Sequence, residues 1–169
     1  MNGTCVIMNF ESLLTSARRG AAFETAVLTE LLHLDTYPRY RAELTRIHAL
    51  TGNVLQQLWE VPTKPSGTVT DIPCSEPVDE YTALMQRLGW NEIMAATMSF
   101  ATAALYRLVW LRLLATPHTR CSIQNLIDLQ KELTEAIADV QQRCRVPDLV
   151  QRRGARVQTR GLHVELCHF

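Results

Sequence analysis

The chain lacks a net charge, because its 17 lysine and arginine residues balance 17 aspartate and glutamate residues among 169 in all. Recognition of nucleic-acid phosphates usually needs a basic excess. We therefore expect no nucleic-acid partner. Six arginines between Arg143 and Arg160 make the C-terminal part locally basic. They are interpreted as a solvated tail or helix face, with contact to an acidic surface as the alternative.

Neither the cysteine spacing nor the N-terminal stretch has the pattern of a secreted protein. The five cysteines are odd in number and widely spaced, with no Cys-x-x-Cys element: Cys5, Cys74, Cys121, Cys144 and Cys167. The N-terminal stretch MNGTCVIMNFESLL has no charged region followed by an apolar core and a cleavage site, so it does not resemble a signal peptide. We expect reduced thiols and an intracellular, cytoplasmic protein.

Catalytic motifs are absent too. The sequence contains no Walker loop, no Gly-x-Gly-x-x-Gly, no His-Glu-x-x-His and no Gly-x-Ser-x-Gly. His163, Cys167 and His168 are the best metal candidates, but three ligands near a chain end fall short of a closed zinc site. We expect no enzyme activity, no cofactor and no bound metal.

What the chain does contain is helical periodicity, with only seven glycines and seven prolines to interrupt it. Apolar spacings of three and four predict helices over 8–19, 21–34, 38–60, 78–88, 90–116, 122–143 and 147–154. Gly20 is expected to end the first of these. Gly52 either permits close approach of another backbone or is a tolerated weak spot. With a Pro- and Gly-rich loop at about 61–76 and a short polar tail from about 155, the sequence predicts a single helical domain over 1–169.

The most apolar segment is LGWNEIMAATMSFATAALYRLVWLRLL, residues 88–114. It is apolar nearly all round from Ile93 to Tyr106, which is typical of a helix buried on most sides. Arg107 and Arg112 interrupt it before the roughly 20 residues that a spanning helix needs. We therefore predict an all-α bundle around a buried central hydrophobic helix. A membrane-inserting role is the alternative.

Two segments resemble the Bcl-2 family of apoptosis regulators, and the likeness covers about residues 78–157. GWNEIMAATMSFATAAL is similar to the family's first homology motif through Trp90, Ile93, Met94, Ser99 and Phe100. EAIADVQQRCRVPDLVQRRGARV is similar to the segment through the second motif, and the matching residues are Ile137, Asp139, Val140, Leu149, Val150, Arg153 and Gly154. The chain departs from the family at Glu92, where the family has an arginine, and at Ala155, where it has a tryptophan.

The resemblance implies a Bcl-2-like helical bundle, such as a viral homologue, that binds the Bcl-2-homology-3 helix of pro-apoptotic partners and inhibits cell death. The partner helix would enter a hydrophobic groove with anchors at i, i+3, i+4 and i+7. Arg87 would take over the pairing with the ligand's carboxylate. The groove residues expected on this basis are Val54, Leu55, Leu58, Leu84, Met85, Arg87, Leu88, Trp90 and Ile93.

Several alternatives stay open at this point. The same fold would suit a protein that binds signalling adaptors of a host cell instead of death ligands. A four-helix cytokine is a second alternative. It would be secreted with paired cysteines, so free thiols in the folded protein would exclude it. A subunit of a larger helical assembly, or a homodimer, would keep its apolar surface covered by a partner. The sequence predicts no transmembrane anchor, and leaves open a peripheral contact with the mitochondrial surface.

Overall fold

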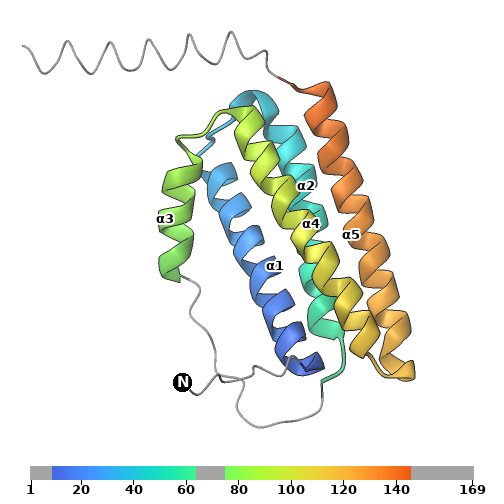
Figure 1. Cartoon of the computed structure of the whole chain (residues 1–169). Coiled ribbons are helices and arrows are strands. Elements are labelled where there is room, and N and C mark those ends of the chain that lie inside the picture. The colour runs from blue at the N-terminus through green and yellow to red at the C-terminus, as the bar shows by residue number, and fades with distance from the viewer. Residues whose placement is uncertain (1–8, 64–74, 146–169) are drawn as a thin grey trace, which may run out of the picture.

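The computed structural model describes residues 9–63 and 75–145, and these residues form helices joined by short connections (Figure 1). The helices are α1 (Phe10–His33), a 3-10 turn η1 (Pro38–Tyr40), α2 (Arg41–Glu60), α3 (Ser75–Met85), α4 (Trp90–Leu114) and α5 (Pro117–Arg143). The predicted all-α class is confirmed. The helix predicted at 147–154, the tail from 155 and the metal candidates His163, Cys167 and His168 lie outside the described residues.

The four long helices form a bundle of two antiparallel hairpins (Figure 1). α1 and α2 make the first hairpin, α4 and α5 make the second, and they pack through α1 against α4 and α2 against α5. α3 packs on α1 and lies outside this ring. A single long crossover, residues 61–89, therefore links the hairpins, whereas a cytokine bundle has two long crossovers.

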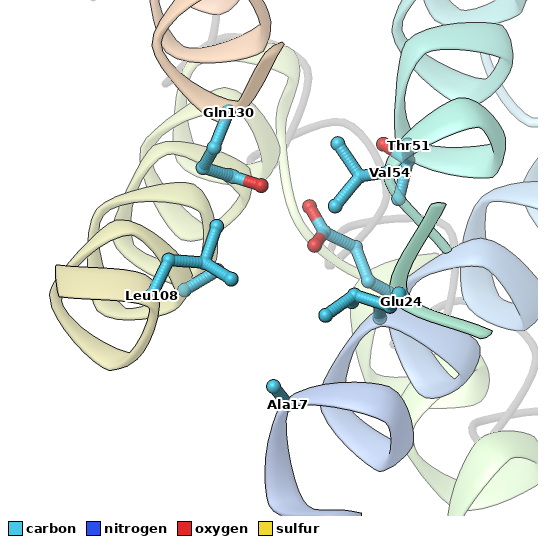
Figure 2. Close-up of a pocket in the computed structure, with 9 residues that line it drawn as sticks. Ala17, Glu24, Thr51, Val54, Leu108 and Gln130 are labelled. Carbon is cyan, nitrogen blue, oxygen red and sulfur yellow. The ribbon is translucent and has the colours of Figure 1, made fainter. Parts of the chain in front are cut away.

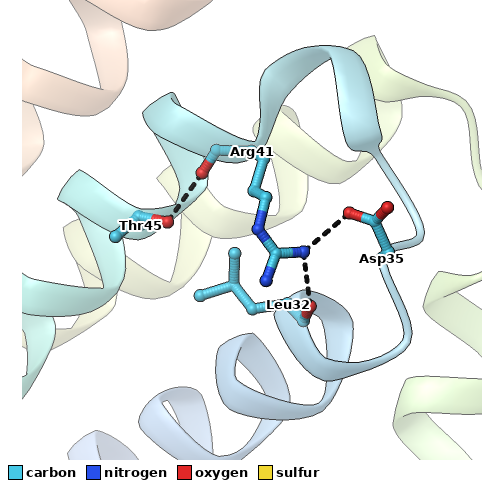
Figure 3. Close-up of polar contacts among 4 residues, drawn as sticks. All are labelled: Leu32, Asp35, Arg41 and Thr45. Atoms are coloured by element: carbon cyan, nitrogen blue, oxygen red, sulfur yellow. Dashed lines mark hydrogen bonds and ion pairs between the residues drawn. The ribbon is translucent and has the colours of Figure 1, made fainter.

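The turn between α1 and α2 is held by polar contacts that Figure 3 shows. Nη1 of Arg41 donates to the carbonyl oxygen of Leu32 at 3.1 Å and to Oδ1 of Asp35 at 2.7 Å. Asp35 has a φ of 49°, in the left-handed region that short polar side chains tolerate better than others do. Thr45 donates to the Arg41 carbonyl one turn later, at 2.8 Å. These contacts satisfy a carbonyl at the end of α1 and fix the direction of α2.

Local capping explains where α1, α4 and α5 begin. The backbone N–H of Ser12 donates to Oδ1 of Asn9 at 2.8 Å, which completes a capping box at the start of α1. The backbone N–H of Gly89 donates to Oε2 of Glu92 at 2.7 Å at the start of α4. The central helix ends before Pro117, as expected, with Leu114 as its last residue. Pro117 is also the first residue of α5, which therefore begins before the expected position 122; the position suits proline because its missing N–H has no intrahelical partner there.

The expected break at Gly20 is wrong, because α1 continues through it to His33. A Cβ at this position would collide with Nη1 of Arg107, so glycine here makes room for a side chain from α4. At Gly52 no atom of another described element lies within 4 Å of the point that a Cβ would occupy. Close backbone approach is therefore excluded at Gly52, and this glycine is a tolerated weak spot in α2.

The core lies between the two hairpins and draws on all four long helices. Its largest fully buried side chains are aliphatic and sulfur-containing: Leu14, Leu31, Leu44, Ile47, Leu58, Ile93, Met94, Leu108, Leu111, Ile123, Leu126 and Leu133. The prediction of a buried central helix is wrong in its geometry. α4 is one wall of a four-helix ring, and a ring of four helices has no inner position for one of its own members, so α4 turns one face to solvent.

Candidate interaction surfaces

The groove residues predicted on α2 face the bundle core. Val54 and Leu58 are buried, and Leu55 is half-buried. Val54 and Leu58 line a small cavity together with residues from α1, α4 and α5. Side chains in this position contribute to folding, and a ligand would reach them only after the bundle opened.

The groove residues predicted around α3 and the start of α4 divide between core and surface. Met85, Trp90 and Ile93 are buried, and Leu88 is half-buried. Leu84 is 56% exposed, and Arg87 is exposed as well. Only Leu84 and Arg87 of this set are fully accessible to a partner.

The structure does not bring the two predicted groove walls together. α2 and α3 each pack on α1, so α1 lies between the two helices that carry the predicted walls (Figure 1). The physical reason is the breadth of the apolar surface of α1, which packs against α2, α3 and α4. Sequence periodicity showed an apolar stripe on α1 but not which neighbours would share it.

Aromatic packing fixes the junction between α3 and α4 against the turn between α1 and α2. The Trp90 ring stacks on Tyr40 with centroids 4.1 Å apart and meets Tyr37 edge-on at 5.6 Å. The hydroxyl of Tyr37 lies 2.9 Å from the carbonyl oxygen of Leu88 and 3.1 Å from that of Met85, within donating distance of both. Trp90 is thus a packing residue in this structure.

Glu92, which stands where the Bcl-2 family has an arginine, has a structural role. Its carboxylate accepts the Gly89 N–H in the first turn of α4, where a negative charge also interacts favourably with the helix dipole. At the position where the family has an arginine, this chain therefore has a glutamate that caps the helix. The side chain remains exposed at the N-terminal end of α4.

Most of the exposed large hydrophobic side chains among the described residues lie on the outer side of α4, which we name the α4 face. Tyr106 is 67% exposed, Trp110 is 55% exposed and Leu113 is 66% exposed. The face consists of exposed residues three, four or one apart: Ala95, Ser99, Ala103, Tyr106, Val109, Trp110, Leu113 and Leu114. By length and composition α4 is also a candidate membrane span, with 28% of its most apolar window buried. The sequence signal for this face was the segment that is apolar nearly all round, but the sequence analysis assigned all sides of that segment to the core.

A second feature is a buried carboxylate among the four long helices (Figure 2). Glu24 is 9% exposed, and its Oε1 has no hydrogen-bond partner within the described part of the chain. It borders a cavity of about 20 Å³, enough for one water molecule. The other lining residues are Ala17, Ala21, Thr51, Val54, Leu58, Ala104, Leu108 and Gln130.

Burial raises the pKa of Glu24 to about 7, and the positive charge of Arg107 opposes this shift. Nε2 of Gln130 donates to the Ala101 carbonyl at 3.1 Å, and Thr51 donates to the Ile47 carbonyl at 2.9 Å. Sequence reasoning missed Glu24. A signal existed, because Glu24 occupies the stripe of Ala17, Ala21, Leu28 and Leu31 at spacings of three and four.

Comparisons with known proteins identify no relative: no protein-family model matches the chain, and neither a curated protein nor a solved structure is significantly similar to it. The resemblance to the Bcl-2 family stays a prediction. No group of three or more His, Cys, Asp or Glu residues that could hold a metal ion occurs among residues 9–63 and 75–145. The free thiols in the same ranges are Cys121 and Cys144.

Proposed function

We propose that this chain is a non-enzymatic regulator of apoptosis that binds the Bcl-2-homology-3 helix of a pro-apoptotic partner along its α4 face. The observation that carries the proposal is the exposed apolar surface of Tyr106, Trp110 and Leu113. Monomeric proteins rarely expose a contiguous apolar patch of this kind unless it has a binding role. The binding class is supported by this surface, and the choice of ligand rests on the sequence resemblance.

The α4 face suits an amphipathic helix as ligand. Its exposed apolar residues follow one another at helical spacing along the second half of α4, so a helix laid against them meets apolar contacts at each turn. Tryptophan and tyrosine are enriched among the residues that dominate binding energy at interfaces. Trp110 and Tyr106 are therefore the anchors we expect on this side.

The identity of the ligand follows from the segments that resemble the first and second Bcl-2 homology motifs. Trp90, Ser99 and Phe100 belong to the first of these. Under this proposal the protein restrains cell death from the cytoplasm or the mitochondrial surface. The proposed surface differs from the groove implied by the resemblance, because most of the predicted groove residues are buried or half-buried.

The experiment is calorimetric titration of the full chain with a panel of Bcl-2-homology-3 peptides. We expect a Kd below about 1 μM, which corresponds to roughly −8 kcal/mol. Trp110→Ser should weaken binding at least about tenfold, as loss of an aromatic anchor does. Leu84→Ser is the matched control, since Leu84 is an equally exposed apolar residue on α3.

Three results would count against parts of this proposal. Absence of binding to every peptide, from a chain that is helical by circular dichroism, would remove the Bcl-2-homology-3 helix as the ligand. Loss of affinity in Leu84→Ser or Arg87→Ala, with Trp110→Ser unaffected, would move the ligand to the junction of α3 and α4. Equal loss in all variants would indicate a change of fold instead of a lost contact.

A further inference from the structure

We infer that the α4 face pairs two copies of this chain, with α4 of one copy antiparallel to α4 of the other across a two-fold axis. This inference goes beyond the proposed function and concerns the chain in the absence of any ligand. Because both use the α4 face, a bound partner helix and a second copy would compete for it. It combines two observations on the α4 face, which are the sizes of its side chains and its area.

The sizes of the side chains make the face complementary to itself. Its first half carries the small residues Ala95, Ser99 and Ala103, and its second half carries Tyr106, Trp110 and Leu114. An antiparallel pair centred between Ala103 and Tyr106 sets each small residue opposite a large one. Ala103 then meets Tyr106 of the partner subunit, and Ser99 meets Trp110 of the partner subunit. A two-fold interface of this kind uses the same patch on both copies.

The area of the face is of the size that a dimer needs. The large side chains Tyr106, Val109, Trp110, Leu113 and Leu114 are 42% to 67% exposed. Together they offer on the order of 600 Å², at the upper limit of patches on monomers. A standard interface buries about 800 Å² on each partner. The small residues of the first half bring the face close to that value.

The sizes of the side chains, and not the charges, select the antiparallel arrangement. Near the first end of the face Glu92 lies with the exposed Arg87 and Arg145, and near the second end Arg112, His118 and Arg120 are exposed. A parallel pair would set Trp110 against Trp110 and Ser99 against Ser99, so large side chains would collide at one end and small ones would leave a gap at the other. A lipid surface would use the aromatic end alone and gives no reason for the small residues of the first half.

The test is sedimentation velocity of the full chain in reducing buffer, over a wide range of concentration and without peptide. We expect a species of twice the 19.2 kDa chain mass. Ser99→Trp should give monomers, because two tryptophans then meet at each contact. Trp110→Ser should weaken the dimer at least about tenfold in Kd, as removal of a central aromatic residue does.

The double variant Ser99→Trp with Trp110→Ser is the decisive sample. Each large side chain again meets a small one, so the dimer should return. A folding defect would not produce this recovery, and circular dichroism checks that all variants are equally helical.

A wild-type chain that stays monomeric at every concentration would overturn the inference, and so would a helical double variant that fails to recover. Monomers that cosediment with anionic phospholipid vesicles would identify a membrane surface as the occupant instead. Peptide binding by a strictly monomeric chain would leave the proposed function standing and this inference refuted. A dimer that binds none of the peptides would support this inference and refute the proposed function.

Discussion

At the scale of single residues, Glu24 stands out as a buried carboxylate whose Oε1 has no hydrogen-bond partner among the described residues. A buried carboxylate loses its hydration, and ionisation then requires a compensating charge or hydrogen bond. The positive charge of Arg107 supplies part of this compensation. Burial, and to a smaller extent the negative charge of Glu24, raise the pKa of Tyr81 on α3. The apolar stripe of α1 includes Val27 and Leu31, which follow Glu24 by three and seven residues, so Glu24 lies on the buried face that the periodicity predicts. Hydrophobic periodicity alone does not show that a polar residue occupies a core position.

We predict that Glu24→Gln stabilises the protein at about pH 8 by roughly 3 kcal/mol and changes little at about pH 4. The pKa of Glu24 is raised from 4.5 to about 7, so the folded state binds the proton more tightly than the unfolded chain. The contribution of wild-type Glu24 to the free energy of unfolding is therefore complete below its pKa in the unfolded chain, and it is lost as the pH rises through about 7. Urea unfolding at both pH values measures this.

Glu135→Gln is the control for that measurement, since Glu135 is exposed on α5. An equal gain in Glu135→Gln and Glu24→Gln would show that net charge, and not burial, causes the effect. A Glu24→Gln variant less stable than wild type at both pH values would show that the carboxylate makes a required contact.

The two glycines inside helices form a matched pair for a second prediction. Replacing a helical glycine by alanine stabilises a helix by roughly 1 kcal/mol when nothing obstructs the new methyl group. Gly52→Ala meets open space and should show this gain, whereas Gly20→Ala must displace the guanidinium of Arg107 and should gain less or lose stability. Thermal unfolding of the two variants decides. A larger gain at Gly20 than at Gly52 would contradict the contact with Arg107.

At the scale of helices, the sequence predicted which segments are helical better than it predicted where each helix begins and ends. α2 and the main part of α5 were expected where they occur, because their apolar spacing is regular and polar residues occupy the opposite face. The expected break at Gly20 and the expected start of α5 at residue 122 were wrong for one reason. Helix ends depend on what packs against them and on capping contacts, and a glycine or proline is compatible with more than one outcome.

The connection between the two hairpins gives a prediction at this scale. Tyr37→Phe removes the hydroxyl that joins the turn after α1 to the carbonyl oxygens of Met85 and Leu88, at the end of α3. Loss of a half-buried hydrogen bond should lower the free energy of unfolding by about 1 kcal/mol. Tyr106→Phe, at a 67% exposed ring, is the control and should leave stability unchanged. Equal effects of the two variants would argue against the role of Tyr37.

At the scale of the whole molecule, the fold class was predictable and the arrangement was not. Few glycines and prolines with steady apolar spacing suffice to predict an all-α bundle. The same sequence placed α4 at the centre, because a helix that is apolar all round is typical of buried positions. Whether its surplus apolar surface meets the core or another molecule is decided by packing between helices. Packing between helices also decides where the predicted groove residues lie, since α1 lies between α2 and α3.

The position of α3 outside the ring leads to a prediction about local stability. α3 has 11 residues and packs mainly on α1, with a smaller contact to α4 through Tyr81 and Phe100, whereas the four long helices are 20 to 27 residues long and pack extensively on one another. Elements with fewer buried contacts open at lower free energy. We expect amides of α3 to exchange hydrogen faster than those of α1 and α5, as measured by mass spectrometry. Protection in α3 equal to that in α1 would show that α3 belongs to the main cooperative unit.

The single crossover has a consequence for how the chain can be divided. A break between Thr63 and Ser75 leaves both helical hairpins covalently intact, with α3 attached to the second. Each half then contains a complete set of the apolar faces by which it recognises the other. The protein is in this sense a heterodimer of two hairpins held in one chain. Two separately expressed halves should assemble into the same bundle, which makes the crossover a natural position for a split reporter.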